Sequence, residues 1–261
     1  MVDWSGGKDR GATPCKDAIW ASVRRDGKAD APVYLRNRQL AEGWLTDLIE
    51  AELTAGRRLM LGFDFPFGYP AGFCRAVTGS NDPFALWNWF EERIMDLPDD
   101  NNRFDLAGSI NRQFGGLGPF WSNGLKRDVP GLPSKKDCYH NPFPERRAVE
   151  QLAKGSFTCW QLAGAGAVGS QVMMGLPVLE RLRRRFVGQV AVWPFEPLDK
   201  PVALVEIWPT LLAGPGPDHW IKDAWQVHKV ALELACLPVA ELQRLLTVTA
   251  PEEGWILGVD Q

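Results

Sequence analysis

The chain lacks the features that mark several large classes of protein. It contains no run of about 18 apolar residues, which is the length that a membrane-spanning helix needs. Its first residues, MVDWSGGKDR, show neither the charged n-region nor the apolar h-region of a signal peptide. We therefore expect a soluble, cytoplasmic, globular protein without a membrane partner.

Cysteine and histidine are scarce. The 261 residues include five Cys, none in a C-x-x-C pair, and three His, none in an H-E-x-x-H pattern. An odd number of scattered cysteines indicates neither a disulfide framework nor a cysteine zinc site. Because no nucleophilic Ser or Cys motif stands out either, carboxylates are the main candidates for chemistry. His219, four residues before Asp223, is the one histidine placed to act as an acid or base.

The net charge of −3 argues mildly against a general nucleic-acid binder, but the charge is unevenly distributed. Residues 101–188 hold 13 Lys and Arg against 6 Asp and Glu, whereas the rest of the chain holds 16 against 26. The basic middle is either a solvated surface or a groove for phosphates. The candidate phosphate-binding residues are Lys126, Arg127, Arg181, Arg184 and Arg185.

Hydrophobic periodicity predicts an α/β protein. An antiparallel opening, with an Asp-Gly turn in RRDGKAD, is followed by a helix over residues 38–55 and a buried strand at LMLGF. A helix over 169–186, two strands in QVAVWPF and VALVEIWP, and a last helix with Asp218 as its N-cap come later. This order favours a mixed sheet with helices on both faces.

Between residues 66 and 165 the periodicity fades, and prolines and glycines become frequent. We interpret 66–165 as a loop-rich basic insertion into a core formed by residues 1–65 and 166–261. Of the twelve tryptophans, several lie in polar stretches such as GPFWSNG. They can stack on bases or sugars, although buried tryptophan is the commoner outcome.

Four acidic residues occupy comparable places at predicted strand ends or helix starts: Asp3, Asp64, Glu206 and Asp223. A buried carboxylate is unfavourable unless a base, a backbone donor or a metal ion pairs with it. Carboxylates gathered at neighbouring strand ends repel one another, and Mg²⁺ or Mn²⁺ would neutralise them. The other interpretations are a helix-dipole contact for Asp223, a turn for Asp3 and an arginine partner for Glu206.

The segments VDWSGG, LGFDFPFG, VEIWP and KDAWQV together resemble the pattern of an uncharacterised bacterial family of predicted ribonuclease H-like nucleases. The resemblance covers roughly residues 1–70 and 165–260 and leaves the insertion unexplained. It implies a ribonuclease H-like mixed sheet, with Asp3, Asp64, Glu206 and Asp223 as catalytic ligands of Mg²⁺ or Mn²⁺. The expected activity is metal-dependent hydrolysis of phosphodiester bonds in a nucleic acid or a small phosphate ester.

Two other functions remain open. Actin-like ATPases and sugar kinases also begin with an Asp and a glycine-rich hairpin, and LAGAGAVGSQ at 162–171 is the candidate for their second phosphate loop. A non-catalytic binding module on the same fold would recognise its ligand without any dependence on Mg²⁺ or Mn²⁺.

Overall fold

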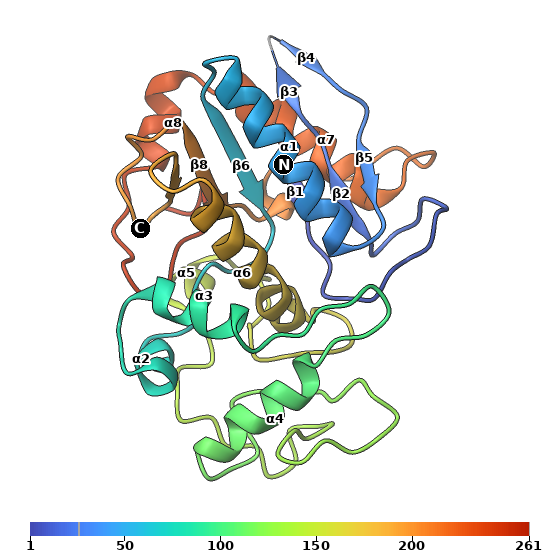
Figure 1. Cartoon of the computed structure of the whole chain (residues 1–261), viewed down its shortest axis with the longest axis vertical. Coiled ribbons are helices and arrows are strands. Elements are labelled where there is room, and N and C mark those ends of the chain that lie inside the picture. Colours follow the sequence, from blue (N-terminus) through green and yellow to red (C-terminus); the bar gives the residue numbers. More distant parts are fainter. Residues whose placement is uncertain (26, 261) are drawn as a thin grey trace.

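The computed structural model describes residues 1–25 and 27–260 and has a mixed α/β architecture (Figure 1). Within these residues the main sheet has six strands in the order β5-β2-β1-β6-β8-β7. The strands are β1 (Val2–Asp3), β2 (Ile19–Ala21), β5 (Val33–Leu35), β6 (Leu59–Phe63), β7 (Val190–Val192) and β8 (Val202–Glu206). Neighbours from β1 to β7 are parallel, and β2 and β5 form an antiparallel edge. The predicted α/β class is confirmed.

The antiparallel opening forms as the alternation of the sequence predicts. Trp20 pairs with Asp3 on one side and with Tyr34 on the other. Between β2 and β5, the short strands β3 (Arg24–Arg25) and β4 (Lys28–Ala29) make a separate two-stranded ladder. The predicted Asp-Gly turn there includes Asp26, which lies outside the described residues.

Helices cover both faces of the sheet, as the order of elements predicts. Helices α1 (Arg38–Thr54) and α6 (Val168–Arg185) lie on one face, and α7 (Lys222–Cys236) lies behind the other (Figure 1). Leu45 of α1 and Val172 of α6 belong to one buried cluster, and Val227 of α7 belongs to the other. Burial on both sides explains why the central strands are almost entirely apolar.

Residues 66–165 form short helices joined by long loops and lie beyond one end of the strands (Figure 1). The helices are α2 (Phe73–Thr78), α3 (Pro83–Glu91), α4 (Arg103–Gln113) and α5 (Ala148–Leu152). Trp87 and Trp160 are fully buried and belong to the same apolar cluster as Phe63 of the sheet. These tryptophans therefore stabilise the fold rather than stack on a ligand.

The end of the chain differs from the prediction. Helix α7 begins at Lys222 with Ile221 as its N-cap, while Asp218 is exposed in the preceding turn and does not cap it. A short 3₁₀ helix (Pro209–Leu211) and helix α8 (Val239–Leu245) were not predicted, and α8 has no buried residue to mark its pattern. None of the helices in residues 1–25 and 27–260 is long and apolar enough to cross a membrane.

Candidate functional site

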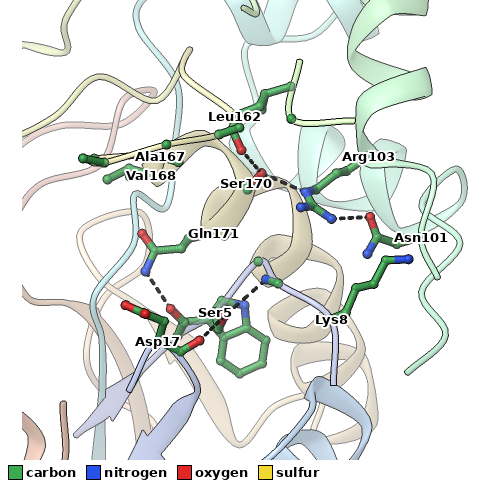
Figure 2. Close-up of a pocket in the computed structure, with 18 of the residues that line it drawn as sticks. Ser5, Lys8, Asp17, Asn101, Arg103, Leu162, Ala167, Val168, Ser170 and Gln171 are labelled. Carbon is green, nitrogen blue, oxygen red and sulfur yellow. Dashed lines mark hydrogen bonds between the residues drawn. The ribbon is translucent and has the colours of Figure 1, made fainter. Parts of the chain in front are cut away.

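A cavity of about 1060 Å³ lies at the carboxyl ends of β1 and β6. It is bounded by the turn after β1, by loops of the 66–165 region and by the first turn of α6 (Figure 2). The first turn of α7 also lines it. In open α/β sheets, ligands bind in the crevice outside the carboxyl ends of the strands. The position of the cavity therefore makes it the first candidate for a functional site.

Four aspartates line one side of this cavity, and we call them the acidic wall: Asp3, Asp17, Asp64 and Asp223. Asp3 ends β1, and Asp64 directly follows β6, the parallel neighbour of β1. Asp17 precedes β2, and Asp223 lies in the first turn of α7. The structure thus brings together three of the four predicted carboxylates and adds Asp17.

Backbone amides hold two members of the acidic wall in place. The Trp4 amide donates a 2.6 Å hydrogen bond to Asp64 Oδ1, and Gln171 Nε2 lies 3.4 Å from Oδ2. The Asp17 amide donates a 2.6 Å hydrogen bond to Asp223 Oδ2. The carboxylate of Asp3 receives no hydrogen bond from the described residues. Asp3 is therefore the member of the wall that most lacks a partner.

The environment disfavours negative charge on Asp3, Asp64 and Asp223. Burial raises the pKa of Asp64 to about 7, against the hydrogen bond from Trp4 that lowers it. Burial, with the charges of Asp64 and Asp223, raises the pKa of Asp3 well above its usual range. Burial also raises the pKa of Asp223. A cation at the wall would relieve this unfavourable charge.

The donor chemistry of the wall fits Mg²⁺ or Mn²⁺, which prefer carboxylate oxygens. No preformed cage is present: within the described ranges, no three His, Cys, Asp or Glu side chains lie together in a group that can hold a metal ion. Mg²⁺ is commonly bound through one or two carboxylates together with waters and substrate phosphate. The wall therefore fits an open site of that kind and does not fit a closed cage.

Cationic side chains also line the cavity: Lys8, Arg103, Arg127 and Lys222. Arg127 forms a 2.6 Å ion pair with Asp105, and both side chains are exposed. Arg103 is half-buried, and the described residues provide no carboxylate within ion-pairing distance of it. The cavity thus presents carboxylates and cations to the same space, which suits a ligand that carries phosphate together with a metal ion.

Two glycine-rich segments meet at the cavity. A Cβ on Gly6 would lie 2.6 Å from the backbone carbonyl carbon of Ser170, so only glycine lets the turn after β1 approach the start of α6 this closely. Buried Arg38 fixes that turn, since it donates hydrogen bonds to the carbonyls of Ser5 and Gly7 and pairs with Asp96. Both predicted phosphate loops therefore border one cavity.

Glu206 does not join the acidic wall. Its carboxylate is buried and forms an ion pair with the buried Arg147, with an Nη1 to Oε2 distance of 2.8 Å. It also accepts a 3.0 Å hydrogen bond from the Phe67 amide. Of the alternatives open for Glu206, the structure provides the arginine partner, which ties β8 to the loop after Asp64 and to the start of α5.

The basic stripe of α6 also lies away from the cavity. Arg181, Arg184 and Arg185 form ion pairs with Glu42, Glu91 and Glu50, respectively. These contacts join α6 to α1 and α3 and leave the three arginines outside the residues that line the cavity.

Two further candidates are also placed elsewhere. Neither Lys126 nor His219 lines the cavity, although Arg127 does. His219 is exposed, and its ring lies beside Trp220.

The sequence did not single out several residues of the cavity, among them Asp17, Arg103 and Gln171. Asp17 precedes β2 and adopts a left-handed conformation with φ of 58°, which an aspartate tolerates. Arg103 reaches the cavity because the 66–165 region folds over the strand ends, and Gln171 reaches it from the first turn of α6, where Nε2 donates a 2.6 Å hydrogen bond to the Trp4 carbonyl. The sequence offered one signal for Asp17. An antiparallel pairing of β1 with β2 places the end of β1, at Asp3, near the start of β2, which Asp17 precedes.

Comparisons with protein-family models, with curated proteins and with solved structures found no significant match for this chain. The functional assignment therefore depends on the chemistry of the cavity.

Proposed function

We propose that the chain is a Mg²⁺- or Mn²⁺-dependent hydrolase of phosphate esters, with phosphodiesters of nucleic acid as the leading substrate class. The observation that carries this proposal is the acidic wall: Asp3, Asp64 and Asp223 lie far apart in the sequence and line one cavity together with cations. A mixed sheet with an antiparallel N-terminal edge and helices on both faces is in keeping with a ribonuclease H-like core.

The acidic wall would hold the metal ion. Asp3 would contribute most directly because its carboxylate has no competing hydrogen bond from the described residues. Asp64 would contribute Oδ2, since Oδ1 is engaged by the Trp4 amide at 2.6 Å. Asp223 would contribute Oδ1, since Oδ2 is engaged by the Asp17 amide. A bound Mg²⁺ or Mn²⁺ supplies a water of lowered pKa and neutralises charge on the phosphoryl oxygens.

The test is hydrolysis of bis(p-nitrophenyl) phosphate and of a short labelled oligonucleotide with Mg²⁺ or Mn²⁺ present. Asp64→Asn keeps the size of the side chain and an acceptor for the Trp4 amide, and it should lower the rate by about a hundredfold or more. Asp218→Asn is the matched control because Asp218 is exposed outside the cavity. A rate that Asp64→Asn leaves unchanged contradicts the proposal.

A second candidate is an ATP-dependent phosphotransferase of the actin-like or sugar-kinase type. It is favoured by one observation, namely that the segments around Gly6 and Gly166 border the same cavity. Backbone amides of such segments can hold phosphates. Tight ATP binding with phosphate transfer to an acceptor, and no cleavage of phosphodiesters, would select this candidate. Ligand binding that is indifferent to divalent metal and without turnover would select a binding module.

A further inference from the structure

The side of the cavity opposite the acidic wall is built around Arg103, the first residue of α4. Its Nε donates a 2.8 Å hydrogen bond to Ser170 Oγ, and Nη1 donates to Asn101 Oδ1 at 2.5 Å (Figure 2). The Ser170 hydroxyl in turn donates to the Leu162 carbonyl at 2.6 Å. The guanidinium also lies over the Phe104 ring, 4.3 Å from its centroid. Three direct contacts therefore fix the orientation of the Arg103 side chain, and the hydrogen bond to Leu162 fixes the Ser170 hydroxyl that it uses.

No carboxylate of the described residues lies within ion-pairing distance of Arg103, and the nearest acidic influence, Asp96, is paired with Arg38. An arginine has five N–H donors, and the two hydrogen bonds to Ser170 and Asn101 occupy only two of them. Burial lowers the pKa of the Arg103 guanidinium to about 10, helped by the charge of Arg38 and opposed by that of Asp96. A half-buried, oriented guanidinium with free N–H donors is suited to a planar or tetrahedral anion from the ligand.

Two neighbouring groups point to the same kind of ligand. The Nδ2 atom of Asn101 is buried at the cavity and has no hydrogen-bond partner in the described structure. Helix α6 begins at Val168, which also lines the cavity, and its N-cap residue, Ala167, provides no side-chain cap. The Val168 and Gly169 amides already donate to the Gly166 and Gln161 carbonyls. The free Nδ2 of Asn101 is therefore the available donor, and the positive end of the helix dipole adds a weaker preference for an anion in the cavity.

The same cavity carries an exposed aromatic ring. Phe157 is 51% exposed and lines the cavity, although most aromatic side chains of the 66–165 region are buried. Its ring packs against Gly166, where a Cβ would come within 2.3 Å of the ring. The ring is thereby held on the loop that leads into α6. An exposed aromatic face that lines the same cavity as a cationic side chain is an arrangement on which nucleic-acid bases stack.

We propose that this side of the cavity binds a nucleoside phosphate unit, with its phosphate on Arg103 and Asn101 and its base on Phe157. The assignment deepens the proposed function, on which it rests for the identity of the substrate, but the binding itself does not require hydrolysis. The unit can come from a free nucleotide or from single-stranded nucleic acid. A cavity of about 1060 Å³ has room for either.

The experiment is calorimetry with dTMP, deoxyribose 5-phosphate and a short oligothymidylate, first in EDTA and then with Mg²⁺. Arg103→Met should weaken the binding of dTMP and of deoxyribose 5-phosphate by about tenfold or more. Arg112→Met, on the exposed side of the same helix, should leave both affinities unchanged. Phe157→Ala should weaken the binding of dTMP by about tenfold and leave the affinity for deoxyribose 5-phosphate unchanged. Leu152→Ala, which removes an equally exposed apolar side chain outside the cavity, is its control.

Equal dTMP affinity in wild type and Arg103→Met overturns the assignment of the phosphate. If that variant does not fold, Arg103→Gln keeps a polar side chain of similar length and removes the positive charge, and unchanged dTMP affinity in Arg103→Gln also overturns the assignment of the phosphate. If Phe157→Ala weakens the binding of dTMP and of deoxyribose 5-phosphate to the same extent, the assignment of the base to Phe157 is overturned. Tighter binding of the oligothymidylate than of dTMP identifies single-stranded nucleic acid as the source, and equal binding identifies a free nucleotide.

The two proposals fail separately. Asp64→Asn should still bind dTMP in EDTA, because Arg103 lies opposite the acidic wall. Binding of dTMP without any metal-dependent hydrolysis would remove the hydrolase and leave the nucleoside phosphate site in place. Metal-dependent hydrolysis that substitutions of Arg103 and Phe157 leave unchanged would support the hydrolase and exclude the nucleoside phosphate site.

Discussion

Neutralising Asp64 should stabilise the folded protein at alkaline pH and not at acidic pH. Burial raises the pKa of this carboxyl from its usual 3.8 to about 7 in the folded state. Between these values the folded state binds a proton that the unfolded state has released, so stability falls as the pH rises. A shift of about three pKa units corresponds to about 4 kcal/mol at 1.36 kcal/mol per unit. Because Asp64 is partly exposed, solvent screening reduces the expected effect to about 2–4 kcal/mol.

The assay is urea unfolding of wild type and Asp64→Asn, followed by tryptophan fluorescence at about pH 5 and about pH 8 without divalent metal. The free energy of unfolding of Asp64→Asn should exceed that of wild type by about 2–4 kcal/mol at the higher pH, and the gap should shrink towards pH 5. Asp218→Asn should change stability by less than about 0.5 kcal/mol at both pH values. A difference between wild type and Asp64→Asn that is the same at both pH values would refute the reasoning.

Two substitutions test the structural residues around the cavity. Glu206→Gln should lower the free energy of unfolding by about 3–5 kcal/mol in urea titrations, because it leaves the buried Arg147 without full compensation; a loss below about 1 kcal/mol would contradict a structural role for this ion pair. Gly6→Ala should lower the free energy of unfolding by about 1–3 kcal/mol, because its Cβ would collide with the Ser170 backbone. Gly43→Ala, at an open position of α1, should raise the free energy of unfolding by about 0.5–1 kcal/mol. Equal effects of the two glycine substitutions on the thermal midpoint would show that the turn after β1 does not pack on α6 as described.

The regular part of the fold could be predicted because its elements repeat at a fixed period. The apolar positions of α1, α6 and α7 recur at helical spacing, and the run LMLGF has the composition of a strand buried on both faces. The prediction of Asp218 as the N-cap of the last helix was wrong, because a capping residue is recognised in a sequence only by its residue type. Here the chain makes another turn before α7 begins at Lys222.

The acidic wall was predicted in part because strand ends are readable in a sequence. Asp3 ends β1 and Asp64 directly follows the apolar strand β6, and the parallel pairing of β1 with β6 puts both at one edge of the sheet. Glu206 looked equivalent, but its side chain is neutralised by Arg147, 59 residues away, and no local pattern reveals such a partner. Arg103 resembled any other cation of the basic middle, because only the folded chain shows that, among the described residues, no carboxylate forms an ion pair with it.

The central claim is that the acidic wall exists to bind a divalent cation, and calorimetric titration of Mn²⁺ tests it most directly. Wild type and Asp218→Asn should bind Mn²⁺ with the same affinity, while Asp3→Asn and Asp64→Asn should each lose that binding or weaken it by about tenfold or more. A wild type that binds no Mn²⁺, even with an oligonucleotide present, or binding that survives in both variants, would contradict the account.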